Sequence, residues 1–188
     1  MAGADLGSAH VKALYHANQM SAKHDEDLVT IGWREWVGLP DLGIETIKAK
    51  VDTGARTSSL HALDIEEFKR GKKTYVRFKV HPEQKNAKFT VECEALVVDK
   101  RRVLPSSGHS EVRTVIATTL ELLGESWTVE LTLTRRDVMG FRMLLGRQAM
   151  RKRCVVDPGT SFIGGRRIKG TKTLMIEKSS DKPRSKKK

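Results

Sequence analysis

The sequence predicts an all-β fold, a closed barrel or sandwich of about nine strands, and three observations support this. Short stretches in which apolar and polar residues alternate recur along the chain, with the period of two expected of strands that bury one face. Turn-forming residues separate these stretches at regular intervals. Helical periodicity is weak, and one short helix of one or two turns is expected, over 148–152.

The N-terminal half opens with a strand over Thr30–Val37, in which two tryptophans flank two charged residues. A turn at 39–43 leads to a second strand, where Ile47, Ala49 and Val51 alternate with lysines. More strands are expected from 60 to 80 around a hairpin turn at Arg70–Lys73, and 64–68 fits either a strand or a helical turn.

The C-terminal half predicts a strand from Phe89 that enters a more buried environment at 96–98. The clearest hairpin pairs 112–122 with 126–134 and places Trp127, Val129, Leu131 and Leu133 on one face. The remaining expected strands are a buried one at 141–147, a last core strand at 154–158, its continuation at 161–163 and an edge strand at 173–176.

Length and composition fit one domain with loose ends. We expect a flexible or partly helical N-terminal extension over 1–30, a globular domain over 31–178 and a disordered basic tail over 179–188. Apolar runs are too short for a membrane-spanning helix, and Met1–Asp5 lacks the pattern of a secretory signal, so the expected compartment is the cytoplasm. Cys93 and Cys154 match no metal-ligand or disulfide pattern and are expected to be buried free thiols.

The charge of the protein is strongly basic. The formal net charge is +12, and because the first 30 residues carry −2 and the last ten +4, residues 31–178 carry +10. A basic body favours acidic partners, which include nucleic acid, the ribosome and acidic protein tails. Aromatic residues are only 5% of the chain and scattered along it, so no aromatic-rich RNA-binding signature is present.

Asp52 is the candidate catalytic residue. It follows an amphipathic strand and enters a tight turn, Asp52-Thr53-Gly54, in which glycine permits close approach of the chain. A single Asp-Thr-Gly is weak evidence, but an apolar strand ending in glycine, Leu144-Leu145-Gly146, follows about ninety residues later and precedes the short helix. This pair of features resembles the retropepsin-like aspartic peptidases, in which the apolar strand supports the catalytic loop.

A closer resemblance extends from about Ile31 to Ile163. The segments WREWVGLPDLGIETIKAKVDTGARTSSLHALDIEEF, SSGHSEVRTVI and TLTRRDVMGFRMLLGRQAM are similar to the bacterial RimB-like retropepsin family, often labelled ATP-dependent zinc protease. Some members accompany the ATP-grasp ligase that adds glutamates to a ribosomal protein. The resemblance implies a closed retropepsin-like barrel, an aspartic endopeptidase, and association with a ribosomal protein or the ligase.

Retropepsin-like chemistry needs two carboxylates that share one proton, one to activate water and one to donate to the carbonyl oxygen. The chain has one such motif, so the resemblance implies a homodimer in which two Asp52 side chains meet across a two-fold axis and Thr53 bridges the loops. An internal partner at Asp157 is disfavoured, because Pro158 replaces the threonine and removes a backbone donor. Asp157 is expected instead to be a turn residue at a strand end.

The labels zinc and ATP find no support in the sequence. His61, His81 and His109 do not show metal-ligand spacing, and Gly164-Gly165 lacks the ending of a phosphate-binding loop. We therefore expect no metal and no cofactor.

Five further residues are candidates for substrate binding. Arg56 and Arg147 either bind an acidic substrate or belong to structural ion pairs, Arg147 with Glu111 or Asp137. The loop around Ser107, Gly108 and His109 is the candidate flap over the substrate, or else an ordinary hairpin tip. His61 is expected to be packed, and the tryptophans to anchor the core or a dimer interface.

Two functions follow from these observations. The first is a homodimeric aspartic hydrolase acting on peptide or isopeptide bonds of an acidic or glutamylated protein tail. The second is a retropepsin-shaped binding module without turnover that docks on a ribosomal protein, a ligase or RNA through its basic surface.

Overall fold

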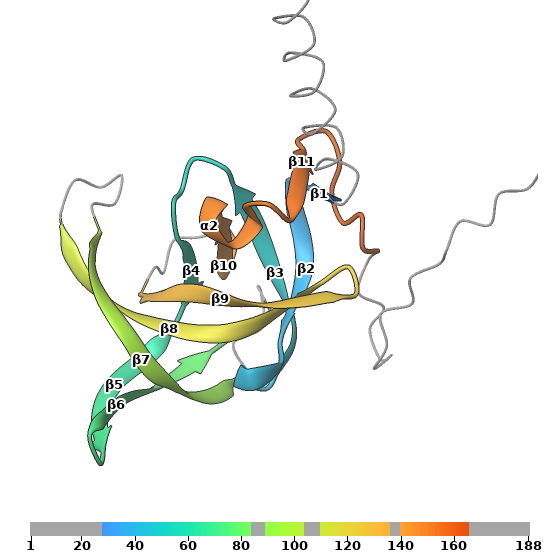
Figure 1. Ribbon diagram of the computed structural model, residues 1–188. Helices are drawn as coiled ribbons and strands as arrows, with labels where there is room; N and C mark the ends of the chain where they lie inside the picture. Colours follow the sequence, from blue (N-terminus) through green and yellow to red (C-terminus); the bar gives the residue numbers. More distant parts are fainter. Residues whose placement is uncertain (1–27, 84–88, 104–109, 136–139, 166–188) are drawn as a thin grey trace, which may run out of the picture.

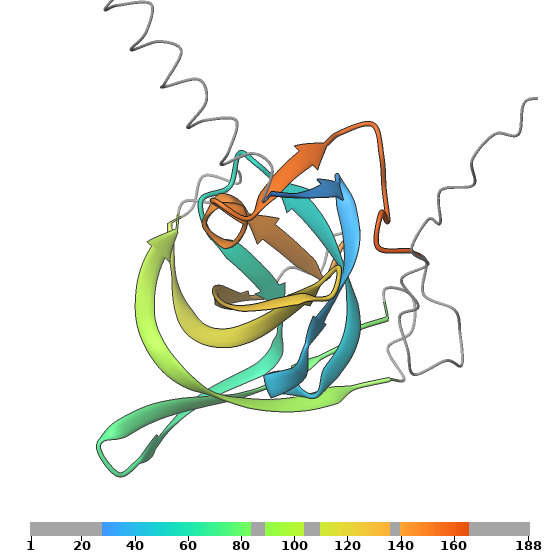
Figure 2. The same cartoon turned by 45° about the vertical axis from the view of Figure 1, so that its right-hand side comes forward.

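The protein folds into a closed β-barrel, as the alternating pattern predicts. The computed structural model describes residues 28–83, 89–103, 110–135 and 140–165. Six strands close the barrel in the order β2, β3, β10, β4, β9, β8, and a single pair, Gly38 with Glu121, joins β8 back to β2. Figure 2 shows the curved strands enclosing the interior. Within the described part of the chain the strand bounds are β1 Val29–Gly32, β2 Arg34–Leu39, β3 Ile44–Asp52, β4 Ser58–His61, β5 Leu63–Arg70, β6 Lys73–Val80, β7 Val91–Val103, β8 Glu111–Leu122, β9 Glu125–Thr134, β10 Met143–Gly146 and β11 Cys154–Asp157.

Three strands extend the sheet beyond the barrel. The first half of β8 pairs with β7, β7 pairs with β6, and β6 pairs with β5. These strands form one extension of the sheet that projects from the closed barrel (Figure 1). A 3-10 turn, η1 (Pro40–Leu42), joins β2 to β3, and the short helix α2 (Arg147–Met150) follows β10 directly. None of the described helices is long and apolar enough to cross a membrane.

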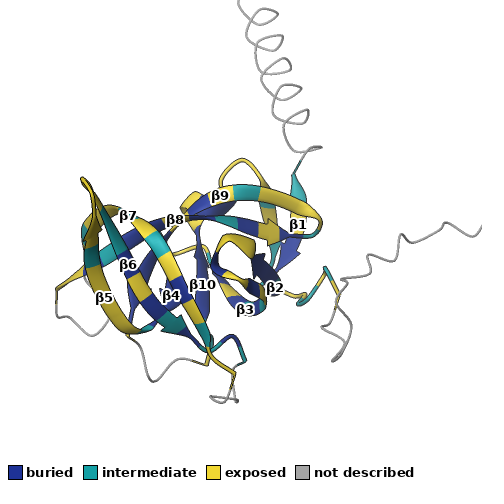
Figure 3. Cartoon of the chain, turned by 90° about the horizontal axis from the view of Figure 1, so that it is seen from below, coloured by how far each residue is buried: buried dark blue, intermediate teal, exposed yellow. Residues whose placement is uncertain are grey.

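The core contains the residues that alternation assigns to it. Ile47, Ala49 and Val51 of β3 are buried and face Met143 and Leu145 of β10. Figure 3 shows the buried faces of the barrel strands and the largely exposed β5 and β7. Burying these apolar side chains stabilises the barrel by about 25 cal/mol per Å² removed from water.

The predicted hairpin between 112 and 134 is present as β8 and β9. Its loop has two residues, because Leu122 pairs with Glu125, and both Leu123 and Gly124 have positive φ, 54° and 86°. Two positive φ values give the strand twist that a tight hairpin requires. Val129, Leu131 and Leu133 are buried, and Trp127 is half-buried, with its Nε1 donating to the Ala149 carbonyl at 2.9 Å.

The single strand predicted at 30–37 is wrong, since the chain forms two strands that break at Trp33. Glu35 is 1% exposed, and its Oε1 accepts the Gly32 N–H at 2.7 Å. A Cβ on Gly32 would lie 2.4 Å from the Thr160 carbonyl oxygen, so only glycine fits there. The Glu35 side chain thus bonds a backbone N–H only three residues earlier. Such a local bond competes with the hydrogen bonds between strands, and the alternation of apolar and polar residues does not reveal it.

The strand predicted at 154–158 is present as β11, but it is not a core strand of the barrel. Among the described residues β11 pairs only with β1, in parallel, and its Val155 is 46% exposed. No strand continues at 161–163, because Phe162 turns the chain with a φ of 58° and donates its N–H to the Arg34 carbonyl at 2.9 Å. The edge strand expected at 173–176 lies outside the described residues.

The region 96–98 does not enter a more buried environment. Leu96 is 36% and Val98 43% exposed, because β7 belongs to the part of the sheet outside the closed barrel, and a register shift lies between Val97 and Asp99. The segment 64–68 is a strand, β5, and not a helical turn.

The two cysteines are free thiols. Cys93 is buried as expected, and desolvation raises the pKa of its thiol to about 12. Cys154 is only partly buried, and desolvation raises its pKa to about 11. Neither thiol is therefore appreciably ionised near neutral pH.

Candidate active site

Asp52 is the last residue of β3, and the turn that follows fixes its carboxylate. Its Oδ1 accepts hydrogen bonds from the backbone N–H groups of Gly54 and Ala55, each at 3.0 Å. The residue is half-buried, and Oδ2 has no hydrogen-bond donor among the residues that the structure describes. One oxygen thus holds the side chain in position while the other remains available.

The loop after Asp52 lies over the end of β10. This strand lies between β3, with which it is parallel, and β4, with which it is antiparallel, so the loop 53–57 must cross its carboxyl end. Gly146 pairs in register with Asp52, and a Cβ on it would lie 2.6 Å from the carbonyl atoms of Thr57. Backbone atoms cannot move aside easily, so this crossing requires glycine.

Hydrogen bonds from the start of α2 fasten the loop. The Gly146 N–H donates to Ser58 Oγ at 3.0 Å, the Arg147 N–H to the Ala55 carbonyl at 2.9 Å, and the Gln148 N–H to the Arg56 carbonyl at 3.1 Å. The first amides of the helix, which lack partners within it, are therefore used to hold the Asp52 loop. Leu144, Leu145 and Gly146 thus lie where the sequence comparison expected supporting residues, with Leu145 fully buried.

A cavity of about 530 Å³ adjoins this loop. Thr53, Arg56 and Arg147 line it, together with Arg151, which the sequence reasoning missed. The sequence does contain a signal for Arg151, because it follows Arg147 by four residues and this spacing places two side chains on the same side of a helix. The remaining lining residues are Gln148, Met150, Cys154 and Val156.

The three arginines of this cavity are exposed cations without acidic partners. Neither Arg56, Arg147 nor Arg151 makes an ion pair with another residue in the described ranges, and all three are exposed. Glu111, one of the expected partners of Arg147, contacts Arg113 instead, and Asp137 lies outside the described ranges. The expected ion pair of Arg147 is therefore not present among the described residues, and its side chain is exposed beside the Asp52 loop.

The candidate flap can be described only at its base. Ser107, Gly108 and His109 lie outside the described residues. The two arms of this hairpin are the ends of β7 and β8, paired as far as Val103 and Glu111, and they lie at the same end of the barrel as α2 (Figure 1).

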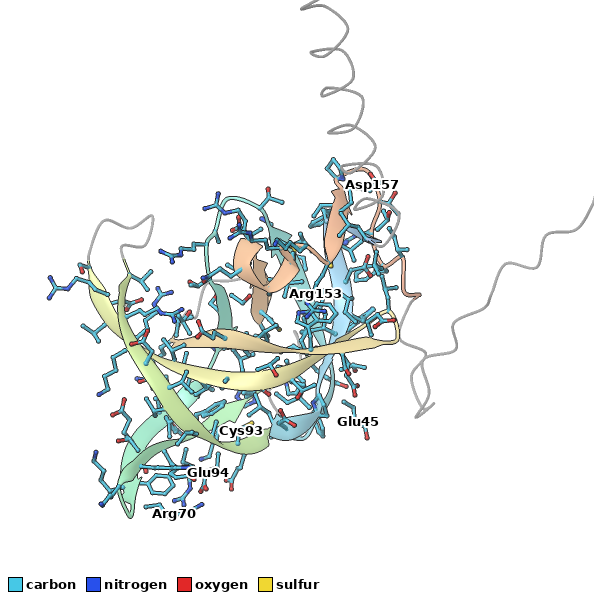
Figure 4. All side chains as sticks on the ribbon, in the orientation of Figure 1. Glu45, Arg70, Cys93, Glu94, Arg153 and Asp157 are labelled. Atoms are coloured by element: carbon cyan, nitrogen blue, oxygen red, sulfur yellow. The ribbon has the colours of Figure 1, made fainter. Side chains whose placement is uncertain are left out.

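Asp157, the disfavoured internal partner, is engaged in its own turn. Its Oδ1 accepts the Gly159 N–H at 2.8 Å and its Oδ2 accepts the Thr160 hydroxyl at 2.5 Å. The hydroxyl and then the amide hold the pKa of this carboxyl below its ordinary value of 3.8. Figure 4 shows Asp157 at the tip of β11. Both oxygens have donors, so this carboxylate has the turn role expected from the sequence.

His61, Trp33 and Trp36 are not among the residues that line the cavity beside Thr53. His61 is buried in β4, 4% exposed. Trp33 and Trp36 belong to a half-buried cluster in which the Arg34 guanidinium lies 4.3 Å from the Trp33 ring and Lys48 Nζ lies 5.5 Å from the Trp36 ring. In the described part of the chain, no group of three or more His, Cys, Asp or Glu side chains is arranged to hold a metal ion.

A larger cavity, about 720 Å³, shares no residue with the Asp52 loop. It lies beside β5 and is lined by both acidic and basic side chains, including Asp64, Glu66, Arg77 and Lys79. Lys79 and Asp64 pair at 3.0 Å, and the lining contains acidic as well as basic side chains, whereas the charged residues that line the cavity beside Thr53 are all arginines.

Comparison with known proteins identifies the relatives of this chain. Residues 30–167 match the family model described as RimB-like, retropepsin-like aspartic endopeptidase RimB. A protein of Shewanella pealeana named probable alpha-L-glutamate ligase is 53% identical over 135 residues, which are 72% of this chain and 30% of that protein. A Desulfotalea psychrophila protein of the same name is 52% identical over 128 residues, 68% of this chain and 28% of that protein. The chain thus matches less than a third of the length of these relatives.

A solved structure shows the same fold. A Legionella pneumophila protein of unknown function superposes with a TM-score of 0.62 at 29% identity, over 72% of this chain and 97% of that one. The six-stranded barrel, the Asp-Thr-Gly loop that crosses Gly146 and the match over residues 30–167 agree, and the chain belongs to the RimB-like family of retropepsin-like aspartic endopeptidases.

Proposed function

We propose that this protein is an aspartic-type hydrolase that activates water with Asp52. The observation that carries the proposal is the asymmetry of the Asp52 carboxylate, whose Oδ1 is held by two backbone amides while its Oδ2 has no donor in the described residues. Such a side chain is oriented in advance and still has an oxygen free to exchange a proton. The backbone bonds from α2 give the loop the rigidity that this chemistry needs.

The second carboxylate comes from a second copy of the chain. Asp157 already has a donor on each oxygen, and no other Asp-Thr-Gly occurs in the sequence. Thr53 and Gly54 are exposed at the tip of the loop, where a two-fold axis would bring two loops together. Two carboxylates at close range share one proton, because both cannot ionise together.

The reaction then proceeds in two steps. The ionised carboxylate takes a proton from water as the oxygen attacks the carbonyl carbon, while the protonated carboxyl donates to the carbonyl oxygen. The tetrahedral intermediate collapses when the C–N bond breaks. The carboxyl that took the proton from water gives it to the leaving nitrogen, and the other carboxylate takes a proton back from a hydroxyl of the intermediate as the C=O bond re-forms, so the dyad again holds one shared proton. Both peptide and isopeptide bonds fit this scheme.

The substrate is an acidic chain. Three guanidinium groups without acidic partners in the described residues, those of Arg56, Arg147 and Arg151, line the cavity next to Thr53. Guanidinium groups bind carboxylates through paired hydrogen bonds, so side-chain carboxylates of a glutamate-rich tail match this surface. Ser107, Gly108 and His109 complete the proposal as the flap over the bound chain.

A glutamate ligase is the proposed partner. In the Shewanella and Desulfotalea proteins, a segment about half identical to this chain is part of a longer protein named glutamate ligase. A glutamate ligase adds the acidic tail that this hydrolase would remove. The two activities, joined in one protein or acting side by side, would then oppose each other on a shared substrate, for which a ribosomal protein is a candidate.

The first prediction concerns Asp52. Asp52→Asn keeps the amide contacts of Oδ1 but cannot exchange the proton, so hydrolysis of a glutamate-tailed peptide should fall by at least about a hundredfold. Mass spectrometry of the products measures this, and circular dichroism checks the fold. Asp157→Asn is the matched control and should keep its activity. An Asp52→Asn variant that cleaves as fast as the wild type would refute the catalytic role.

The unpaired arginines also favour a second function, binding of acidic chains without turnover. This function needs only the cavity, and it predicts tight binding of a glutamate-tailed peptide that Arg147→Ala weakens, with no product at any pH. A cleavage product that disappears when pepstatin is added would exclude it.

A further inference from the structure

The hairpin of β5 and β6 is a projecting element that the proposed hydrolase does not use. Its last pair is Arg70 with Lys73, and Gly71 has a φ of 61°, so the two strands turn within two residues. The hairpin extends away from the barrel, and its turn lies at the opposite end of the molecule from α2 (Figures 1 and 2).

The turn of this hairpin is a concentrated positive charge. Residues 68–77 contain five cations and no acidic residue. Lys72 and Lys73 are exposed and make no ion pair with any residue in the described ranges. Lys69 is held by its own strand partner, because its Nζ donates to the Thr74 hydroxyl at 2.8 Å.

Aromatic stacking fixes the two arginines at the base of the turn. Phe68 and Tyr75 stack across the strands with ring centroids 6.0 Å apart. The Arg70 guanidinium lies 4.7 Å from the Tyr75 centroid and that of Arg77 lies 5.2 Å from the Phe68 centroid. Both guanidinium groups also contact Glu94, at 2.7 and 3.6 Å (Figure 4). One acid therefore offsets two cations, and the cluster keeps an excess of positive charge.

The shape of the element decides which anion it fits. Each ring is already in contact with a guanidinium group and with the other ring, which disfavours their use as platforms for bases. The turn is convex and carries its charges on both strands of a narrow ribbon, whereas an acidic peptide is better held in a concave cavity such as the one beside Thr53. A two-stranded β-ribbon is an element that enters a nucleic-acid groove, where phosphates run along both sides.

We propose that the turn of the β5–β6 hairpin, centred on Lys72 and Lys73, binds the phosphodiester backbone of a nucleic-acid duplex without reading its sequence. The contact is electrostatic, and it lies at the end of the molecule away from the Asp52 loop. It therefore operates independently of the hydrolase, and it would place the protein on a nucleic-acid-containing assembly while the other end engages an acidic chain.

The test is duplex binding by the full chain as a function of salt. Fluorescence anisotropy with a labelled DNA duplex and with an RNA duplex of the same sequence, from roughly 50 to 200 mM salt, gives the slope of log K against log salt. Lys72→Ala/Lys73→Ala should weaken binding and flatten that slope by about 2 on DNA, because two phosphate contacts are lost. Arg147→Ala/Arg151→Ala removes the same charge at the α2 end and should leave both quantities unchanged.

The outcomes separate the possibilities. Binding of either duplex that depends on the hairpin lysines supports the proposal and tells whether DNA or RNA is preferred. Absence of duplex binding, or equal losses in the two double variants, would overturn it, the latter because the charge of the whole molecule would then be responsible. Loss of binding to poly-glutamate but not to duplex in the hairpin variant would assign the turn to acidic proteins instead. The hairpin variant should keep wild-type hydrolysis and denaturation curves, since both lysines are exposed.

Discussion

The environment of individual carboxylates separates the proposed catalytic residue, Asp52, from a structural one, Asp157. Asp52 and Asp157 both end a strand and both accept the N–H of the glycine two residues on, at 3.0 and 2.8 Å. The difference lies in the second oxygen, which receives the Thr160 hydroxyl in Asp157 and has no described donor in Asp52. The two loops differ in the residues that follow the aspartate. Asp157 is followed by Pro158 and by Thr160, which supplies the hydroxyl, whereas the corresponding residues after Asp52 are Thr53 and Ala55.

Gly146 provides a prediction at this scale. Gly146→Ala would place a Cβ 2.6 Å from the Thr57 carbonyl, which displaces the loop that holds Asp52. We expect a loss of about 1–3 kcal/mol in the free energy of unfolding and a larger relative loss of hydrolysis. Urea denaturation and the glutamate-tailed peptide assay measure the two effects.

Gly159→Ala is the matched control for this substitution. Its Cβ would meet only the Asp157 side chain, at 3.3 Å. If Gly146→Ala were as stable and as active as Gly159→Ala, the crossing of the loop over Gly146 would not be the support that we describe.

Among the secondary-structure elements, the break between β1 and β2 organises the region behind the Asp52 strand. The Trp33 carbonyl accepts the Val51 N–H at 2.9 Å, next to Asp52, and the Trp33 N–H donates to the Thr160 carbonyl at 2.9 Å. Glu35 connects this break to the chain after β11, since its carboxylate also accepts the N–H groups of Ile163 at 2.9 Å and Gly164 at 3.5 Å. One buried carboxylate thus joins three chain segments.

Glu35 provides the prediction for this element. Glu35→Ala leaves the buried N–H of Gly32 without its acceptor and also removes the acceptor of the Ile163 N–H, so the free energy of unfolding should fall by about 2–3 kcal/mol. Glu35→Gln keeps one carbonyl oxygen and should lose roughly half as much. Chemical denaturation gives both values, and equal stability of the Ala and Gln variants would contradict the role of the carboxylate as acceptor.

At the scale of the whole molecule, charge is divided between two ends. Ion pairs such as Lys100–Glu67 and Arg101–Glu130 connect strands β5 to β9 along the extended sheet. The α2 end has arginines around a cavity and the hairpin turn has lysines on a projecting tip, and neither group forms an ion pair with the residues that the structure describes. Two basic surfaces of opposite curvature suit two different acidic partners.

The proposed dimer provides the prediction at this scale. If the dyad forms across a two-fold axis, a heterodimer of wild type and Asp52→Asn is inactive. In an equal mixture of the two proteins, once the subunits have exchanged, about half of the wild-type chains are paired with an Asp52→Asn chain. The mixture should then have about half the activity that its wild-type chains have before mixing. Hydrolysis before and after mixing measures this, with sedimentation to confirm the dimer. Unchanged activity after complete exchange would show that each chain works with its own Asp52 alone.

Much of the fold was predictable from local pattern. Alternation located the strands around Ile47, Val76 and Leu131, and the resemblance carried by Asp52 and Gly146 predicted that the strand ending at Gly146 lies beside the Asp52 loop. Periodicity failed where a contact distant in sequence decides the conformation. Alternation predicts one continuous strand at 30–37, but the hydrogen bond of Glu35 to Gly32 accompanies a break in it. Val155 is exposed although its segment is apolar, because among the described residues β11 pairs only with β1.

The sequence by itself determined which residues are candidates for the chemistry and which faces of most strands are buried, since both depend on side-chain type and on spacing within a few residues. Only the tertiary structure decided that β10 lies between β3 and β4, that the oxygens of Asp157 are occupied, and that Arg151 lies beside Arg56 and Thr53. These facts depend on segments far apart in the chain. Their positions follow from how the closed barrel buries its apolar faces as a whole, and no local pattern contains that information.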